Sequence, residues 1–454
     1  MSKVFENNLF VDGLIEKVMT NNFIESSYYD KYNVKRGLRN ENGTGVLVGL
    51  TRVGSVTGYQ MKNDEKLPAE GELYFRGINI KDMVAGFQQE QRRGFEESVY
   101  LLLFGELPTP QALQQFNELL DKYRDLPKGF TENMILKIPS KDIMNKLQRS
   151  ILVLYSYDDD PDNISISNVL KQSIELIARF PAIISYGYQA KAHNFDGKSL
   201  YIHSPKRGIG TAENILHMIR PDNAYTKVEA ETLDLCMAIH ADHGGGDNSS
   251  FATHVVSSNG TDTYSAIAAA VGCLKGPRHG GANIMVRNMV SNIRENVAAW
   301  SDRGKLKDYL LKILSKEAYD KKGLIYGMGH AVYTLSDPRA ILLKKKAYQL
   351  AVEKDAIQEF ELYKNIEELT IELIKSLKGA DAVISANVDL YSGFVFDKLG
   401  IPSDLYTPLF AASRVAGWCA HRLETIVSDN RIIRPAYKNV NPNMEYIPMK
   451  DRNL

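Results

Sequence analysis

The chain contains 454 residues, of which 55 are Lys or Arg and 55 are Asp or Glu, so its formal net charge is zero. A neutral chain has no overall field that would attract nucleic acid or an anionic membrane surface, so we expect neither as a partner. Hydrophobic residues make up 44% and charged residues 24%, which excludes a disordered chain and favours a globular protein with a sizeable core.

Acidic residues interrupt the N-terminal segment, MSKVFENNLFVDGLIEKVM, and no apolar run of about 20 residues occurs in the chain. The three cysteines lie far apart in apolar stretches, at Cys236, Cys273 and Cys419. This pattern is typical of buried reduced thiols rather than of a disulfide framework or a zinc site. We therefore expect a cytoplasmic protein without a membrane anchor.

Patterns typical of strands are confined to one early region. β-Branched and aromatic residues are frequent in residues 46–60 and 72–80, and a polar segment with Pro68 and Gly71 separates them. This arrangement predicts β-hairpins. Nearly all of the chain after residue 80 favours helices, so the predicted fold class is mainly α with a small N-terminal β region.

Helix boundaries are well marked at several places. An apolar run ends at Gly105, and Thr109 and Pro110 then supply an N-cap and a proline at the first helical position. An alanine-rich segment, TDTYSAIAAAVGCLKG (residues 261–276), is stopped by Gly276 and Pro277. Its small residues on all faces predict a helix that is buried on all sides.

The nine histidines all lie between His193 and His421, so acid–base chemistry at neutral pH is expected in the second half of the chain. Three glycine-flanked segments there contain histidine or aspartate: residues 276–283, 327–340 and 385–393. Glycines bring backbone N–H groups close to a ligand and leave room around a histidine ring. Each segment alone could be an ordinary loop, but together they indicate a functional site.

The segment HADHGGGDNSS allows several interpretations. His240 and His243 are three residues apart on one helical face, with Asp242 and Asp247 nearby, which is compatible with a metal site. The same residues could instead be a helix end closed by Gly244. The HGGG sequence also resembles the oxyanion loop of some esterases, but the G-x-S-x-G motif of those enzymes is absent from the chain.

Four segments in this order resemble the citrate synthase family: GPRHGGAN, GMGHAVYTLSDPRA, NVDLYSG and AASRVAGWCAHRLE. The resemblance extends to HADH, YLLLFGELPT and YFRGI, and it spans roughly residues 45–435. It implies an almost entirely helical homodimer in which a smaller domain closes over the substrates. In this chain the large domain would comprise residues 1–283 and 394–454, and the small domain residues 284–393.

The resemblance also implies a reaction, the condensation of acetyl-CoA with oxaloacetate to citryl-CoA, followed by hydrolysis to citrate and CoA. Acetyl-CoA is then a substrate, and neither a metal nor a redox cofactor is implied. The family also includes 2-methylcitrate synthases, which use propionyl-CoA with the same catalytic residues. One methyl group changes binding by only about 1–3 kcal/mol in an apolar pocket, so this activity and dual specificity stay open. A second alternative is a family member that retains the fold as a binding or structural protein but has no catalytic activity. Such a protein would be expected to lack at least one catalytic residue.

By this resemblance three residues carry the chemistry. Asp389 would be the base that removes a methyl proton, and His279 would donate a hydrogen bond to the developing enolate oxygen. A carboxylate and a neutral histidine suit these two roles. His330 would polarise and protonate the oxaloacetate carbonyl. Asp389 also precedes a predicted helix, whose N-terminal end would keep its carboxylate ionised.

Oxaloacetate has two carboxylates, which arginines bind well because the guanidinium can donate two parallel hydrogen bonds. The family pattern places these arginines at Arg339, Arg414 and Arg434, with His243 as a further substrate contact. Arg434 lies 20 residues after Arg414 and would reach the partner subunit's site in a homodimer. Other histidines of these segments are expected to be structural: His240, His254 and His421.

The chain departs from the family pattern near the expected CoA site. Position 278 is Arg278 where leucine is common, and Thr334 replaces a residue that is basic in parts of the family and helps to bind CoA phosphates there. HADH is followed by GGGDNSS where many members have a glutamate. Arg278, Lys275 and the Lys344–Lys346 run could replace the missing contact, so the residues that bind CoA stay unassigned.

Overall fold

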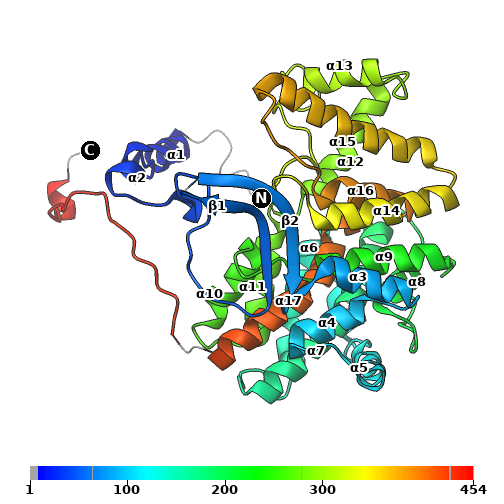
Figure 1. Ribbon diagram of the computed structural model, residues 1–454. Coiled ribbons are helices and arrows are strands. Elements are labelled where there is room, and N and C mark those ends of the chain that lie inside the picture. Colours follow the sequence, from blue (N-terminus) through cyan, green and yellow to red (C-terminus); the bar gives the residue numbers. More distant parts are fainter. Residues whose placement is uncertain (1–8, 64, 278, 429–430, 453–454) are drawn as a thin grey trace. The chain divides into compact units, whose positions relative to one another are not determined.

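The computed structural model describes residues 9–63, 65–277, 279–428 and 431–452. Most of them lie in helices, and a small antiparallel sheet has the order β1-β2-β3 (Figure 1). The mainly α fold class with an early β region is therefore confirmed. Contacts divide the chain into two units, one formed by the two ends of the chain, up to Val48 and from Arg434, and one formed by Gly49–Ile433.

The strands and the first helices are β1 (Gly54–Lys62), β2 (Glu65–Phe75), β3 (Ile78–Asn79), α1 (Leu9–Asn21), α2 (Ser27–Lys31), α3 (Ile80–Gln89), α4 (Phe95–Phe104), α5 (Pro110–Tyr123), α6 (Ile143–Leu154), α7 (Ile166–Asp196), α8 (Thr211–Ile219) and α9 (Lys227–His240). The later helices are α10 (Asn248–Ser257), α11 (Thr263–Lys275), α12 (Ala282–Asn296), α13 (Arg303–Leu314), α14 (Pro338–Glu353), α15 (Ile357–Lys378), α16 (Val388–Lys398) and α17 (Tyr406–Ser428). Short single turns are η2 (Arg36–Leu38), η3 (Thr131–Leu136), η4 (Tyr155–Tyr157), η5 (Ser403–Leu405) and η6 (Met449–Asp451).

The expected hairpin is present, but its strands differ from the predicted ranges. The turn follows Lys62, and β2 runs through the segment that the sequence suggested to be a polar connection. Pro68 lies within β2 opposite Tyr59. Backbone groups of β2 form hydrogen bonds with residues 334–336. Leu335 N donates to Ala69 O at 3.4 Å, and Gly71 N donates to the Ser336 hydroxyl at 3.1 Å. These long-range contacts extend the strand beyond its local propensity.

The predicted helix boundaries are confirmed where caps marked them. Thr109 Oγ1 accepts a hydrogen bond from Ala112 N at 3.2 Å at the start of α5. Helix α4 ends before Gly105, whose φ of 83° is the left-handed conformation that glycine adopts without strain. Helix α11 ends before Gly276, and its alanines at positions 266, 268 and 270 are buried. The prediction of burial on all sides is too strong, because Ser265, Ala269 and Gly272 on one face are only half-buried.

Helix α17 forms the centre of the larger unit. Almost all of its residues from Tyr406 to Leu423 are buried, and it packs against α4, α7, α9, α10 and α11 (Figure 1). Helices α12–α16 pack mainly on one another, while α9 contacts both α17 and α14. These five helices lie largely within the predicted small domain, residues 284–393; the first two residues of α12 and the last five of α16 lie outside it. The domain boundaries stay a prediction.

Within the described ranges, no helix has both the length and the apolar composition that crossing a membrane requires. The three cysteines carry free thiols, and two of them, Cys236 and Cys419, are buried.

Candidate active site

Two of the glycine-flanked segments lie side by side and present His330 and Asp389. Gly329 N donates to Ser385 O at 2.8 Å, and Asn387 donates from its N to Gly327 O at 2.9 Å and from its Nδ2 to Gly329 O at 2.8 Å. Gly327 and Gly329 have φ values of 84° and 85°, which other residues rarely adopt. The glycines that the sequence analysis singled out therefore allow this close pairing.

The hydrogen bonds of His330 define which of its ring nitrogens carries the proton. Its Nδ1 lies 3.0 Å from Val332 N and 3.2 Å from Tyr333 N, and both backbone groups can only donate. Nδ1 therefore accepts, and the proton of the neutral ring is on Nε2. This tautomer places the donor of the ring on Nε2.

Asp389 is the second residue of α16, whose N-cap is Asn387; Asn387 Oδ1 accepts a hydrogen bond from Asp389 N at 3.0 Å. The helix predicted to follow Asp389 is present, but it begins at Val388, so Asp389 lies in its first turn. Burial raises the pKa of Asp389 to about 6, against the opposing effect of Arg339. A carboxylate with such a pKa is ionised at neutral pH and is a stronger base than an ordinary aspartate.

Asp337 is a positioning residue that the sequence analysis missed. It is fully buried, and its Oδ1 accepts hydrogen bonds from Arg339 N at 2.9 Å and Arg339 Nε at 3.1 Å. Its Oδ2 accepts from Arg339 Nη2 at 2.8 Å and from Val388 N at 3.1 Å. One carboxylate therefore joins the first turns of α14 and α16 and fixes the guanidinium of Arg339. The signal in the sequence was an aspartate directly before Pro-Arg at a helix start.

Arg414 is fully buried in α17 and presents unused donors. Its Nε donates to His240 O at 2.7 Å, and its guanidinium carbon lies 4.7 Å from the centre of the Phe410 ring. Its Nη1 forms an ion pair with Asp247 Oδ2 at 3.2 Å, whereas its Nη2 has no hydrogen-bond acceptor among the residues that the structure describes. Buried donors of this kind are costly unless a ligand or water satisfies them, so this guanidinium is prepared for an acceptor such as a carboxylate.

Two further buried polar atoms lie in the same region. His243 Nε2 and the Tyr333 hydroxyl have no hydrogen-bond partner in the described part of the chain. The His243 ring centre is 5.3 Å from that of His330 and 5.6 Å from that of Tyr333. Burial, aided by the positive charge of Arg339, holds the pKa of His243 well below its usual range, so its ring is neutral. Tyr333 was not singled out by the sequence analysis.

His279 lies near Asp389, with its Nε2 3.2 Å from Asp247 Oδ1 and 3.1 Å from Ser249 Oγ. Asp247 Oδ2 in turn lies 3.2 Å from Arg414 Nη1. Although burial opposes ionisation, Arg414 and His279 hold the pKa of Asp247 well below its usual range. The predicted residues His279, His330, Asp389, His243, Arg339 and Arg414 thus belong to one connected group of side chains.

The expected structural histidines are tied to the fold by hydrogen bonds. His240 Nδ1 lies 2.7 Å from Cys236 O, and His421 Nε2 lies 3.0 Å from Asp242 Oδ1. Burial disfavours a charged His421 ring, but Asp242 raises the pKa of His421 to about 9. The ligand atoms of His254, His421 and Glu424 lie within 4.8 Å of one another. Within the described residues, this set differs from the metal site that the sequence allowed in HADHGGGD, which would use His240 and His243 with Asp242 and Asp247.

The alternative contacts suggested for CoA are engaged elsewhere or lie outside the described residues. The Thr334 hydroxyl accepts from Ala69 N at 3.0 Å and contacts Gly58 O, so it is bound to the hairpin. Lys275 pairs with Asp142 at 3.3 Å. The first and last members of the lysine run also pair with carboxylates, Lys344 with Glu367 at 2.7 Å and Lys346 with Glu231 at 2.6 Å. Arg278 lies outside the described residues. The residues that bind CoA stay unassigned.

Arg434 belongs to the unit formed by the ends of the chain, and its side chain is exposed. The structure describes that unit by itself, so the expectation that Arg434 completes a partner's site stays a prediction.

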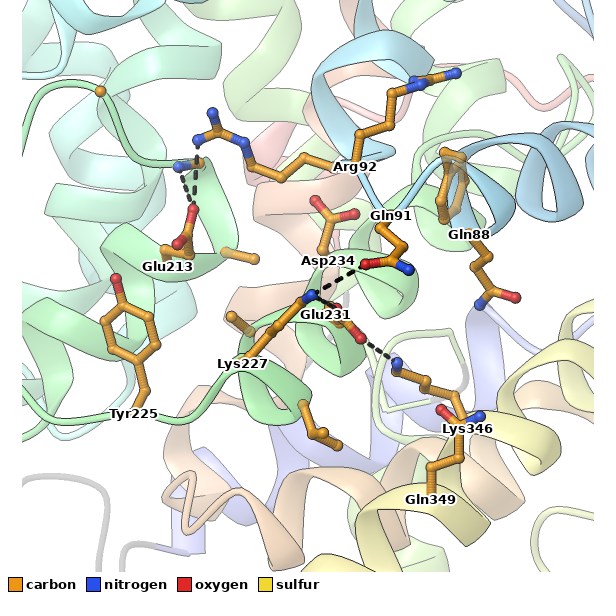
Figure 2. A pocket seen from close by; sticks show the side chains of 17 residues that line it. Gln88, Gln91, Arg92, Glu213, Tyr225, Lys227, Glu231, Asp234, Lys346 and Gln349 are labelled. Carbon is orange, nitrogen blue, oxygen red and sulfur yellow. Dashed lines mark hydrogen bonds and ion pairs between the residues drawn. The ribbon is translucent and has the colours of Figure 1, made fainter.

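A cavity of ≈ 1040 Å³ lies elsewhere, between α3, α8, α9 and α14 (Figure 2). None of the six residues above lines it. Its charged groups are paired, as for Lys346 with Glu231 at 2.6 Å and Arg93 with Glu213 at 3.3 Å. Asp234, near its centre in Figure 2, accepts a hydrogen bond from Gly94 N at 2.7 Å and so caps α4. We therefore place the candidate active site at the polar group around Arg414 and Asp389.

The chain is similar to known proteins along most of its length. The family model for the C-terminal domain of citrate synthase matches residues 42–436. A citrate synthase of Haloferax volcanii is 31% identical over 92% of this chain and 99% of its own length. The 2-methylcitrate synthase 1 of Corynebacterium glutamicum is 30% identical over 85% of this chain and 94% of its own length.

Solved structures show the same similarity. The crystal structure of a citrate synthase from Pyrobaculum aerophilum has a TM-score of 0.73 at 30% identity and covers 90% of this chain and 94% of its own. A ternary complex of the Thermoplasma acidophilum citrate synthase with carboxymethyl coenzyme A and oxaloacetate has a TM-score of 0.74 at 27% identity, with 92% and 99% coverage.

Proposed function

Because the chain belongs to the citrate synthase family, we propose that it condenses acetyl-CoA with oxaloacetate to citryl-CoA and hydrolyses this to citrate and CoA. The reaction is an acyl transfer in which the acetyl group becomes an alkyl group. The main support is the set of buried, unpaired polar atoms on Arg414, His243 and Tyr333 beside Asp389 and His330. Such a set suits a small, polar, anionic substrate.

In this proposal the oxaloacetate carboxylates bind Arg414 and Arg339. Arg414 has Nη2 without a partner while its Nη1 pairs with Asp247, and Asp337 holds Arg339 in one orientation before the substrate arrives. His243 adds a contact from its neutral ring, and Arg434 of the partner subunit completes the site. A preorganised site loses less side-chain entropy on binding.

Catalysis begins when Asp389 removes a proton from the methyl group of acetyl-CoA. His279 donates a hydrogen bond to the thioester oxygen, where negative charge develops. The enolate carbon then attacks the oxaloacetate carbonyl, and the Nε2 proton of His330 neutralises the new alkoxide. The Nδ1 contacts of His330 support this assignment, because they keep the proton on Nε2.

A 2-methylcitrate synthase, or an enzyme with dual specificity, is the alternative. Its support is that two 2-methylcitrate synthases of Corynebacterium glutamicum are 30% and 29% identical to this chain over most of its length. The test is the rate of thiol release with oxaloacetate and either acetyl-CoA or propionyl-CoA. We expect a higher kcat/KM for acetyl-CoA. A preference for propionyl-CoA would favour the alternative, and no thiol release with either would contradict both.

We also propose a cytoplasmic homodimer. Helix α1 exposes a set of large apolar side chains, Leu9, Phe10, Leu14, Ile15, Val18 and Met19. An apolar group of this size on one short helix favours burial against another chain. Burial of this helix in a dimer would bring the chain ends, including Arg434, into the assembly.

A further inference from the structure

Two histidine rings face each other where α10 packs against α17. His254 Nε2 lies 3.2 Å from His421 Nδ1, and the ring centres are 4.9 Å apart. Glu424, one turn after His421 on α17, brings a carboxylate to the same place, with its Oε2 3.9 Å from His421 Nδ1. None of these three residues belongs to the predicted catalytic or substrate-binding set, so the proposed reaction leaves them without a role.

The hydrogen bonds of His254 place its ring proton on Nδ1. This atom lies 2.8 Å from Thr425 Oγ1, and the Thr425 hydroxyl donates its own proton to His421 O at 2.9 Å. Thr425 therefore accepts from His254, and Nδ1 donates. In the neutral ring, Nε2 then points a lone pair toward His421.

His421 has its proton on the side away from His254. Its Nε2 lies 3.0 Å from Asp242 Oδ1, and a carboxylate oxygen can only accept. In the neutral ring, Nδ1 then points a lone pair toward His254. Two lone pairs at 3.2 Å repel each other unless a cation lies between them. Without a metal ion a proton would take this place, in agreement with the pKa of His421, which Asp242 raises to about 9 although burial opposes it.

The carboxylate of Glu424 distinguishes a metal ion from a proton. Its Oε1 accepts a hydrogen bond from Arg52 N at 2.5 Å, whereas its buried Oε2 has no hydrogen-bond partner within the described residues. A proton shared by the two rings would leave this oxygen unsatisfied, which is costly in a buried position. A metal ion could bind both nitrogens and the oxygen, since the three ligand atoms lie within 4.8 Å of one another.

The spacing and the donor types suit zinc. Zinc binds histidine nitrogens at about 2.0–2.1 Å in a tetrahedral arrangement, which places two such nitrogens about 3.3 Å apart. The observed separation is 3.2 Å, and the 3.9 Å from His421 Nδ1 to Glu424 Oε2 would shorten by roughly half an ångström on binding. Nitrogen ligands disfavour Ca²⁺ and Mg²⁺, which prefer oxygen alone.

The groups around the two rings are those expected around a zinc site. Metal-binding histidines usually donate their other ring proton to a carboxylate, a carbonyl or water, and here Asp242 accepts from His421 and the Thr425 hydroxyl from His254. Gly245 leaves room beside the pair, because a Cβ at this position would lie 3.2 Å from His254 Nε2. A water molecule could therefore enter as a fourth ligand.

The charges near the two rings favour a divalent cation. Asp242 and Glu424 both lie next to His421, and together they balance the charge of Zn²⁺ when both rings bind as neutral ligands. Burial lowers the pKa of Arg76, against the opposing effect of these two carboxylates. The guanidinium of Arg76 donates to Leu102 O at 2.7 Å, so its positive charge opposes the cation only from a position fixed elsewhere.

We propose that His254 Nε2, His421 Nδ1 and Glu424 Oε2 bind one Zn²⁺ ion, with water as the fourth ligand. The ion has a structural role, because it ties α10 to α17 and, through the hydrogen bond of Arg52 N to Glu424, to the segment before β1. It takes no part in the condensation, so this inference is independent of the proposed function.

The direct test is zinc binding by the full-length protein after treatment with a chelator and desalting. Titration with zinc chloride in competition with a chromophoric chelator should show one site per chain with a Kd of about 1 μM or lower. Cobalt chloride in place of zinc should give the visible absorption of a tetrahedral site.

Variants on both helices identify the ligands. His254→Gln and Glu424→Gln should each weaken zinc binding by about 100-fold or more. His203→Gln is the matched control, because His203 also lies beside a second histidine, His217, with ring centres 5.8 Å apart, but its Nε2 faces Pro221 O at 3.2 Å. This variant should bind zinc as the wild type does. Circular dichroism would establish that each variant is folded.

Thermal unfolding supplies a second readout. Zinc should raise the Tm of the wild type and of His203→Gln but not of His254→Gln, since an ion that binds only the folded state stabilises it. Absence of a tight site in the wild type would overturn the proposal and leave a proton between the two rings. Unchanged zinc affinity in folded His254→Gln or Glu424→Gln would overturn it as well, because the ion would then bind elsewhere.

Discussion

Asp389 combines a position at a helix start with a raised pKa, and both features bear on its role as a base. Replacement by Asn retains the size of the side chain and the hydrogen bond from its backbone to Asn387 but removes proton abstraction. We expect turnover of Asp389→Asn to fall by about 100-fold or more, with oxaloacetate affinity largely retained. Thiol release and calorimetric titration of oxaloacetate would measure the two quantities.

The control is Asp397→Asn, in the last turn of the same helix, where the carboxylate pairs with Lys398 at 3.3 Å. This variant should have near wild-type turnover. If Asp389→Asn also turned over at the wild-type rate, Asp389 would not be the base.

The pH dependence of the reaction follows from the same residue. Because burial raises the pKa of Asp389 to about 6, the base is ionised above this pH and protonated below it. We expect kcat/KM to fall tenfold per pH unit as the pH decreases below about 6, since the protonated acid does not accept the methyl proton. Steady-state rates between about pH 4 and pH 8 at constant ionic strength would measure it, and a flat profile over this range would contradict the assignment.

At this scale the sequence predicted candidate reacting groups, which the structure brings into one region, but it did not predict the residues that support them. His279, His330 and Asp389 stand in recognisable segments, whereas Asp337 and Asp247 act through backbone and side-chain groups that are distant in the chain. Asp337, for example, accepts from Val388 N, 51 residues later. Such a pairing depends on the packing of α14 against α16, which local patterns do not contain.

Among the elements, the contact of strand β2 with residues 334–336 links the hairpin to the segment that follows His330. Gly71 makes this contact possible, because a Cβ at this position would lie 2.1 Å from Ser336 O and 2.7 Å from a ring carbon of Tyr333. We expect Gly71→Ala to lower the free energy of unfolding by about 1–3 kcal/mol and to reduce kcat, since Tyr333 N bonds to His330.

Gly86→Ala is the matched control for this experiment. Gly86 lies inside α3, and a Cβ there would meet nothing within 4 Å. Alanine in a helix interior should raise the free energy of unfolding by about 0.5–1 kcal/mol without a change in kcat. Chemical denaturation and thiol release would compare the variants, and equal stability of Gly71→Ala and Gly86→Ala would show that the contact contributes little.

The strand boundaries show where local patterns stop being informative. Pro68 and Gly71 favour a turn by their intrinsic preferences, and the sequence placed a connection there. In the structure they lie within β2, because residues 334–336 satisfy the outer edge of the strand. Helices with a cap, such as α5 and α11, were predicted well because the signal lies within the element itself.

For the whole molecule, the proposed homodimer makes a prediction about shared sites. Arg434→Ala and His279→Ala homodimers should each be inactive. In a mixed dimer, one site contains the intact His279 of one subunit and the intact Arg434 of the other. Random exchange of equal amounts should therefore restore about a quarter of wild-type activity, because half of the dimers are mixed and each has one complete site.

Mixing after partial denaturation and refolding, followed by thiol release, would measure this recovery. Mixing each variant with itself in the same way is the control. Absence of recovery in dimers verified as mixed would show that Arg434 acts within its own subunit.

Domain closure gives a second prediction for the whole molecule. Arg339 and His330 lie in the predicted small domain, and Arg414 and His243 in the predicted large one, so a bound dicarboxylate would hold the two together. We expect oxaloacetate to tighten the binding of an unreactive acetyl-CoA analogue, and Arg339→Ala to weaken this coupling. Calorimetric titrations with and without oxaloacetate would show it, and equal affinities in both would contradict the closure model.

The order of the motifs was sufficient to predict the mainly α fold and the family. The same segments did not predict that contacts would group the two ends of the chain in a unit of their own. Those ends contain no motif and expose many apolar side chains, so their surroundings depend on partners that the sequence of one chain does not describe.

The carboxylate of Asp337 also limits how this site can be redesigned. Since it bonds to both Arg339 and Val388 N, any shift of the first turn of α16 would also turn the guanidinium of Arg339. The position of α16 and the affinity for oxaloacetate, which we propose that Arg339 binds, are therefore mechanically coupled. A directed-evolution experiment for longer acyl groups should accumulate its substitutions on other walls of the pocket and leave Asp337 unchanged.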